Sequence, residues 1–405
     1  MNLVALRSPE FRLYFLGAVA NVNALWISRI VIGWLAWDMT GSPQFVGIVA
    51  ACSLLPTLLG GPFFGVIVDR SDIKKAAYAT NIAMIGCITV LSALQVSGNI
   101  TQISLILIAL AIGTVTAAHH PVRLSLAPRL VEPVYVTSVV ALSALNFNLA
   151  RLISPAIGGL LIDLTSPTTA LMVTLILFLP NLTILFRLHP RELTKHSTEP
   201  FTTAMAEGLR YIRQRSVILI VLVTTTVFSI TIRGVLEVLP IIADGSFKLG
   251  AVGLGQLGSA VGGGALCSAL YKALGWQQIS RNALSLGNMS IAIIGIMAVA
   301  VLGTTQIWYM ALLCAALLGA TGTYFGVTMQ SMIQWDLPDN MRGRVMSIWV
   351  VVGLGSTALG AFLIGTLANL IGIGAASLWI SGLGLFALLV LMLFNPISLT
   401  DKSIH

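Results

Sequence analysis

Charged side chains are scarce in this sequence. Acidic and basic residues together make up 9% of the chain, whereas a soluble globular domain carries roughly 25%. Hydrophobic residues make up 57% of the chain, and the mean hydropathy is +0.95. The shortage of charge excludes an ordinary soluble fold and predicts a protein built for a lipid bilayer.

The sequence is also poor in cysteine and in the signatures of catalysis. Its four cysteines all fall within apolar segments, where an isolated thiol behaves as a small hydrophobe, so we predict no disulfide and no metal site: Cys52, Cys87, Cys267 and Cys314. The chain shows no zinc signature, nucleophile elbow, phosphate-binding loop or ATP-binding domain. We therefore predict no enzyme and no cofactor. Energy for any transport must therefore come from an ion gradient or from the concentration gradient of the substrate itself.

Long apolar segments dominate what remains. A helix needs about 20 apolar residues to cross the hydrocarbon core, and short loops rich in Gly, Pro, Ser and Asn separate such segments here. The first segment is too long for a cleaved signal peptide and contains Arg29. We predict twelve spans, at 12–38, 43–66, 76–97, 101–121, 134–163, 168–188, 217–242, 249–271, 282–303, 306–332, 344–370 and 373–394.

The distribution of basic residues predicts the orientation in the membrane. Most of the 22 Lys and Arg residues fall in the loops on the same side as the N-terminus, and such residues accumulate on the cytoplasmic side. Both termini are therefore predicted to be cytoplasmic. The net charge of +8 follows from this topology, and nothing in it requires a nucleic-acid partner.

The chain divides into two similar parts. The longest polar stretch follows the sixth span, and we predict an N-terminal six-helix bundle at 1–188, a cytoplasmic linker at 189–216 and a C-terminal six-helix bundle at 217–405. At an offset near 206 residues, Gly47 stands opposite Gly253, and the Gly158–Gly159 pair stands opposite the region of Gly365. Parallel repeats of this kind are typical of two-bundle secondary transporters.

Several motifs resemble those of the major facilitator superfamily, in particular the branch that contains enterobactin exporters and related drug-efflux proteins. These motifs are "FRLYFLG", "GWLAWDMTGSP", "GVIVDRSDIKK", "HPVRLSLAPRLVEP", "NLARLISPAIGGLLID" and "LPDNMRGRVMSIW". The resemblance covers essentially the whole chain. It implies an all-α membrane protein with twelve transmembrane helices in two pseudo-symmetric six-helix bundles, located in a bacterial cytoplasmic (inner) membrane.

The loop after the second span resembles the superfamily's diagnostic motif, with Asp72 where a second glycine is usual. The resemblance implies a cytoplasmic gate made by Gly65, Asp69, Arg70 and Lys74, in which Asp69 docks on the start of the eleventh helix. A carboxylate at a helix N-terminus is stabilised by about 0.3–2 kcal/mol. The alternative is that the basic residues only set the topology.

The fifth span contains "ARLISPAIGG", which resembles a glycine-rich motif associated with antiporters. Ala150 and Ser154 replace two of its glycines, whereas Pro155, Gly158 and Gly159 match. Small residues let helix backbones approach closely, and proline bends a helix. The motif therefore predicts a tight contact between the two halves, although ordinary small-residue packing explains it equally well.

Four ionisable residues lie inside the spans. An ionisable group in the hydrocarbon region is costly and marks a functional site by default. Arg29, Arg151 and Arg233 are candidates for binding an anionic substrate, and Glu237 is the candidate for proton coupling or an outer gate. Arg233 and Glu237 stand at i and i+4, where they can pair. Alternatively, a structural network could hold the arginines through Glu237, Asn21, Asn23, Asn146 or Asn148.

We therefore predict a transporter that works by alternating access, most simply a proton-coupled exporter of a siderophore or drug. Its expected partners are a small-molecule substrate, protons and the lipid bilayer, and we expect a monomer. The alternatives are a lysophospholipid transporter, an uptake symporter or a membrane receptor that does not transport. We interpret His119 and His120 as interfacial histidines in preference to proton carriers.

Overall fold

The computed structural model describes residues 3–191, 201–274, 283–335 and 337–394. Within these ranges only the backbone is described at residues 3, 61–62, 65–66, 69–70, 201–204, 339–340 and 394. "Inner" and "outer" below denote the ends of helices predicted to face the cytoplasm and away from it. The predicted division into two bundles with a linker at 189–216 stays a prediction, and helices are grouped below by chain order only.

The first group contains six long helices. They are α1 (Pro9–Asp38), α2 (Pro43–Arg70), α3 (Ile73–Val96), α4 (Gln102–Leu126), α5 (Val136–Leu164) and α6 (Pro167–Arg187). A short 3-10 turn precedes α1 at Leu3–Arg7, and two more, Ala127–Leu130 and Pro133–Tyr135, lie between α4 and α5. We call α1–α6 the N-terminal group.

Local sequence explains where these helices begin. Ser8, Ser42 and Ser166 each accept a hydrogen bond from a backbone N–H in the first turn, and each precedes a proline that opens the helix. A serine at the N-cap satisfies a backbone donor that would otherwise be unpaired, and proline at the first helical position loses no hydrogen bond. Asp72 caps α3 in the same way.

The remaining helices form the C-terminal group, α8–α14, preceded by the short helix α7 (Phe201–Arg213). Their bounds are α8 (Ser216–Phe228), α9 (Gly234–Leu236), α10 (Gly250–Ala273), α11 (Leu286–Thr304), α12 (Trp308–Trp335), α13 (Asp339–Ile371) and α14 (Ile373–Phe394). Helix α7 packs on the inner end of α13, where Arg344 donates a charged hydrogen bond to Glu207. A Cβ atom built at Gly208 would lie 3.0 Å from Cδ1 of Ile348, so the two helices approach closely.

The seventh span is irregular. Helix α8 continues into a π-helical turn, η4 (Ser229–Arg233), then the single turn α9, and a second π-helical turn, η5 (Ile241–Ser246), precedes α10. Single π-turns inside helices are rare and frequently occur at functional sites.

Membrane-crossing helices account for most of the described chain. Eleven of its segments are long and apolar enough to cross a bilayer. The glycine-rich helix α10 is not among them, yet its 24 residues exceed the roughly 20 that a span requires. Together these segments match the predicted twelve-helix fold.

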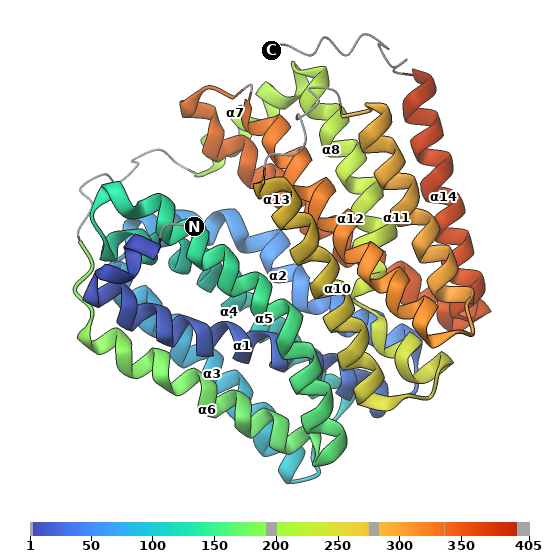
Figure 1. The fold of residues 1–405 in the computed structure, drawn as a ribbon, viewed down its shortest axis with the longest axis horizontal. Helices are drawn as coiled ribbons and strands as arrows, with labels where there is room; N and C mark the ends of the chain where they lie inside the picture. Colours follow the sequence, from blue (N-terminus) through green and yellow to red (C-terminus); the bar gives the residue numbers. More distant parts are fainter. Residues whose placement is uncertain (1–2, 192–200, 275–282, 336, 395–405) are drawn as a thin grey trace.

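The two groups meet at their outer ends (Figure 1). Helix α2 packs along α13, and α5 packs along α10. At each crossing two glycines face each other: Gly47 meets Gly365, and Gly159 meets Gly255. A Cβ atom built at Gly47 or Gly159 would lie 2.6 or 2.4 Å from a backbone oxygen of the facing helix. The helices can approach this closely because glycine has no side chain.

Candidate functional site

The embedded charges meet where the two groups meet. Arg29 of α1 forms a charged hydrogen bond with both carboxylate oxygens of Glu237. The Glu237 side chain is 14% exposed and that of Arg29 is 48% exposed. This ion pair links the two groups, and loss of Arg29 without a replacement would leave the less exposed carboxylate uncompensated.

The predicted pairing of Arg233 with Glu237 is not the one that the structure shows. The i, i+4 spacing brings side chains together only in a regular α-helix, and here the π-turn η4 ends at Arg233 while Glu237 follows the last residue of α9. Glu237 turns to Arg29 of the other group instead. It still acts electrostatically on Arg233.

Arg233 lies in a slot made by two glycines of its own group. A Cβ atom at Gly326 of α12 would lie 2.6 Å from its Nη2 atom, and one at Gly353 of α13 would lie 3.9 Å from Nη1. No sequence pattern indicated this slot, because the two glycines lie far from Arg233 along the chain.

Arg151 completes the charged cluster. Its guanidinium lies 5.9 Å from the ring centroid of Trp26, and that of Arg29 lies 5.5 Å from the same ring. Arg29, Arg233 and Glu237 all act electrostatically on Arg151. The structure thus brings the four predicted residues into one region, with three cations around one carboxylate.

The motif in α5 contacts the C-terminal group. The backbone N–H of Ala156 donates to Oγ of Ser259 at 3.1 Å, and a Cβ atom at Gly258 would lie 2.7 Å from Cβ of Pro155. Gly159 faces Gly255, while Gly158 faces Ile30 of its own group. Helices α5 and α10 therefore approach closely at Pro155 and Gly159.

Further links close the outer side. Nε1 of Trp37 donates to Oδ2 of Asp244 at 2.9 Å, and Oγ of Ser42 donates to Oδ1 of Asn369 at 3.3 Å. Together with the Arg29–Glu237 pair and the two glycine contacts, we call these links the outer gate. The gate is closed in this structure.

The loop between α2 and α3 is only partly described. Lys74 does not reach the other group in the described contacts: its Nζ atom donates to the carbonyl oxygens of Phe186 and Leu188, at 3.0 and 2.7 Å. A cation at the C-terminal carbonyls of α6 stabilises that helix end. The side chains of Asp69 and Arg70, and the surroundings of Gly65, lie outside the described residues, so the cytoplasmic latch stays a prediction.

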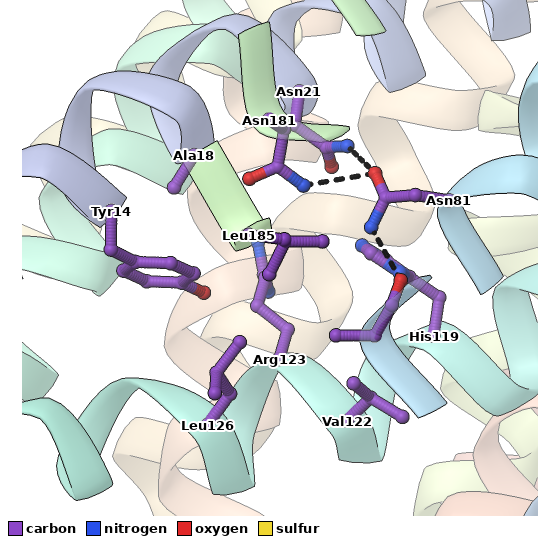
Figure 2. A pocket seen from close by; sticks show the side chains of 11 residues that line it. Tyr14, Ala18, Asn21, Asn81, His119, Val122, Arg123, Leu126, Asn181 and Leu185 are labelled. Carbon is purple, nitrogen blue, oxygen red and sulfur yellow. Dashed lines mark hydrogen bonds between the residues drawn. The ribbon is translucent and has the colours of Figure 1, made fainter. Parts of the chain in front are cut away.

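A second polar cluster, which sequence reasoning missed, lies inside the N-terminal group (Figure 2). Oδ1 of Asn81 accepts hydrogen bonds from the amides of Asn21 and Asn181 at 2.8 and 2.9 Å. These residues border a small chamber that Tyr14 and Arg123 also line. Oδ1 of Asn181 is buried without a described partner. Asparagines spaced along three different helices give no periodic signal, so only packing reveals this cluster.

His119 also borders the chamber. It is 9% exposed, and its Nδ1 atom lies 3.1 Å from Oγ1 of Thr80. The hydrogen bond anchors the ring in the bundle interior, away from the Arg29–Glu237 pair.

Comparison with known proteins agrees with this architecture. A family profile described as "Transmembrane secretion effector" matches residues 2–404. The chain belongs to this family of the major facilitator superfamily. This transporter is 24% identical to the staphyloferrin A transporter of Staphylococcus aureus over 86% of its own chain and 87% of the relative. It is 26% identical to the enterobactin exporter EntS of Shigella boydii serotype 4, over 98% of its own chain and 95% of the relative.

A solved structure gives the same fold. The nucleoside transporter NupG superposes with a TM-score of 0.72 at 11% identity, covering 98% of this transporter and all of that chain. At such low identity the likeness shows the fold alone. The chain is therefore a multi-pass membrane transporter of this superfamily.

Proposed function

We propose that this transporter exports an acidic small molecule of siderophore type across a bacterial inner membrane, in exchange for protons. Two relatives named for siderophores support the substrate type. The observation that carries the proposal is the charged cluster of Arg29, Arg151, Arg233 and Glu237, in which Arg29 pairs with Glu237 and shares the ring of Trp26 with Arg151. A lipophilic cation would require the opposite balance of charge.

The cluster suits recognition of planar anions. A guanidinium presents its donors as a fork that matches a carboxylate or catecholate in a bidentate way. When the gate is closed, Nη2 of Arg29 donates to both carboxylate oxygens of Glu237. An anionic group of the substrate can take the place of Glu237, because the Arg29 side chain is 48% exposed and therefore accessible. Substrate binding then removes one of the links that hold the gate shut.

Glu237 is the proposed coupling residue. After the anion has left to the outside, a proton from outside binds the freed Glu237 carboxylate, and its release on the inner side lets Glu237 pair with Arg29 again. The inner side would close as the outer gate opens, with the latch at Asp69 as the predicted inner lock. Both termini are proposed to lie in the cytoplasm on the basis of the loop charges.

Proton movement in proteoliposomes tests the proposal. We expect a catecholate or citrate-type anion to stimulate proton movement, and ethidium to have no effect. Glu237→Gln should abolish proton-driven accumulation while substrate exchange between equal compartments continues. Arg29→Lys keeps the charge but loses the fork, and should weaken anion transport about tenfold, the effect of losing one charged hydrogen bond of about 1.5 kcal/mol.

Three outcomes would count against the proposal. Preferential transport of ethidium would overturn the anionic substrate. Normal proton-driven transport by the Glu237→Gln variant would remove Glu237 from coupling. Loss of substrate exchange in that variant would make Glu237 a gate or binding residue instead.

A further inference from the structure

A continuous row of cationic and aromatic side chains leads from the inner end of α4 to the outer gate. Cζ of Arg123 lies 5.3 Å from the ring centroid of Phe147. The ring of Phe147 meets that of Trp26 edge to face, with centroids 5.6 Å apart. Trp26 in turn lies beside the guanidinium groups of Arg29 and Arg151. We call these five residues the arginine–aromatic row.

The row has a definite direction across the membrane. Arg123 lies three residues from the inner end of α4, whereas Arg29 reaches across to the other group at the outer gate. On α5, Phe147 and Arg151 stand at i and i+4 and share a face. Counting about 1.5 Å per residue from the start of α5, Phe147 lies about 16 Å and Arg151 about 22 Å into the helix.

The row carries more positive charge than the described residues neutralise. Among the part of the chain that the structure describes, only Arg29 of its three arginines has a carboxylate within 4 Å. Cation–π contacts with Phe147 and Trp26 compensate a buried guanidinium only in part. An embedded cation without a counter-charge is by default a functional residue.

Phe147 is accessible, and Arg123 is held in place. Phe147 is 37% exposed, so a ligand can reach its ring. Arg123 also lines the polar chamber with Tyr14 and Asn181, and Figure 2 shows its side chain rising from α4 toward that chamber. The guanidinium therefore lies between a buried polar cluster on one side and an exposed aromatic ring on the other.

We propose that Arg123 and Phe147 form an inner binding subsite for a planar aromatic anion, such as an arenecarboxylate or a catecholate. The inference rests on the proposed function and narrows its substrate class. The guanidinium donates to the anionic oxygens, and the aromatic ring of the substrate packs against Phe147 and then Trp26. An aliphatic polycarboxylate would use the arginines but would gain nothing from the two rings.

Calorimetric titration of the full chain in lipid nanodiscs tests the subsite, with 2,3-dihydroxybenzoate and citrate as probes. Phe147→Leu removes the ring but keeps an apolar side chain. We expect it to weaken dihydroxybenzoate binding about two- to tenfold, the range measured for single aromatic contacts, and to leave citrate binding unchanged. Phe147→Tyr keeps the ring and should restore binding. Arg123→Lys should weaken dihydroxybenzoate binding because it loses the fork.

A matched control comes from an aromatic contact elsewhere in the N-terminal group. Phe186 is 71% exposed and packs against Tyr78 with centroids 4.8 Å apart, so Phe186→Leu should bind both probes like the unmodified protein. If the unmodified protein binds both probes, and Phe147→Leu and Arg123→Lys bind dihydroxybenzoate as tightly as it does, the subsite alone is overturned. If Phe147→Leu weakens citrate binding as much as dihydroxybenzoate binding, the aromatic preference is overturned. The same holds if Phe147→Tyr binds dihydroxybenzoate as weakly as Phe147→Leu does. If the unmodified protein binds neither probe, the proposed function itself is overturned.

Discussion

Replacing Gly47 by alanine should open the outer gate. The added Cβ atom would lie 2.6 Å from the carbonyl oxygen of Ala361 on α13. Ordinary van der Waals contact begins at 3.4 Å, so α2 and α13 must separate by about 0.8 Å here, the difference of these two distances. The contact atom belongs to backbone and cannot rotate away, so the helices themselves must move.

The size of the effect follows from the cost of overpacking. An extra methyl group in a packed contact costs about 1–3 kcal/mol, and about 1.4 kcal/mol changes a population ratio tenfold. The contact exists only when the gate is closed, so the cost falls on the closed state. We expect the ratio of closed to open molecules to fall about 5- to 150-fold.

Double electron–electron resonance measures distances between two spin labels on the outer side and so reports this ratio of closed to open molecules. Spin labels at Ser97 and Tyr309, both on the outer side and exposed, report the separation of the two groups in a background without native cysteines. Gly86→Ala is the matched control: it makes the same change within a helix, with nothing within 4 Å of the new Cβ atom. A distance distribution for Gly47→Ala that equals the control would refute the glycine contact as a determinant of closure.

Three other substitutions have defined outcomes. Asp72→Ala removes the N-cap of α3 and should lower the free energy of unfolding by about 0.5–2 kcal/mol, whereas Asp72→Asn should not; thermal unfolding in detergent distinguishes the two. Asn81→Leu removes the oxygen that accepts from the side-chain amides of Asn21 and Asn181. The same assay should show a free energy of unfolding lower by about 1–3 kcal/mol for each unpaired donor. Gly326→Ala should displace the Arg233 guanidinium and weaken binding of the anionic probes, while Gly322→Ala, which meets nothing within 4 Å, should bind them normally.

Local sequence determined the helices and their ends. Apolar segments of sufficient length predicted the spans, and the Ser-Pro pairs at 8–9, 42–43 and 166–167 begin three of the helices. The repeat offset also singled out Gly47, Gly159 and Gly365, although it matched Gly47 with Gly253 and not with its contact partner Gly365. These features could be predicted because they depend on neighbours in the chain or on composition averaged over a span.

Tertiary structure alone decided which charges meet. Glu237 pairs with Arg29, 208 residues away in the chain, because the regular helix ends at Leu236 and Glu237 stands in the turn that follows it. Arg123 is one basic residue among many at the inner helix ends, and only the tertiary structure places it over Phe147 of α5. A sequence specifies the face of a helix that each side chain occupies, but partners on other helices depend on how those helices pack and where their register breaks, and no short-range pattern carries that information.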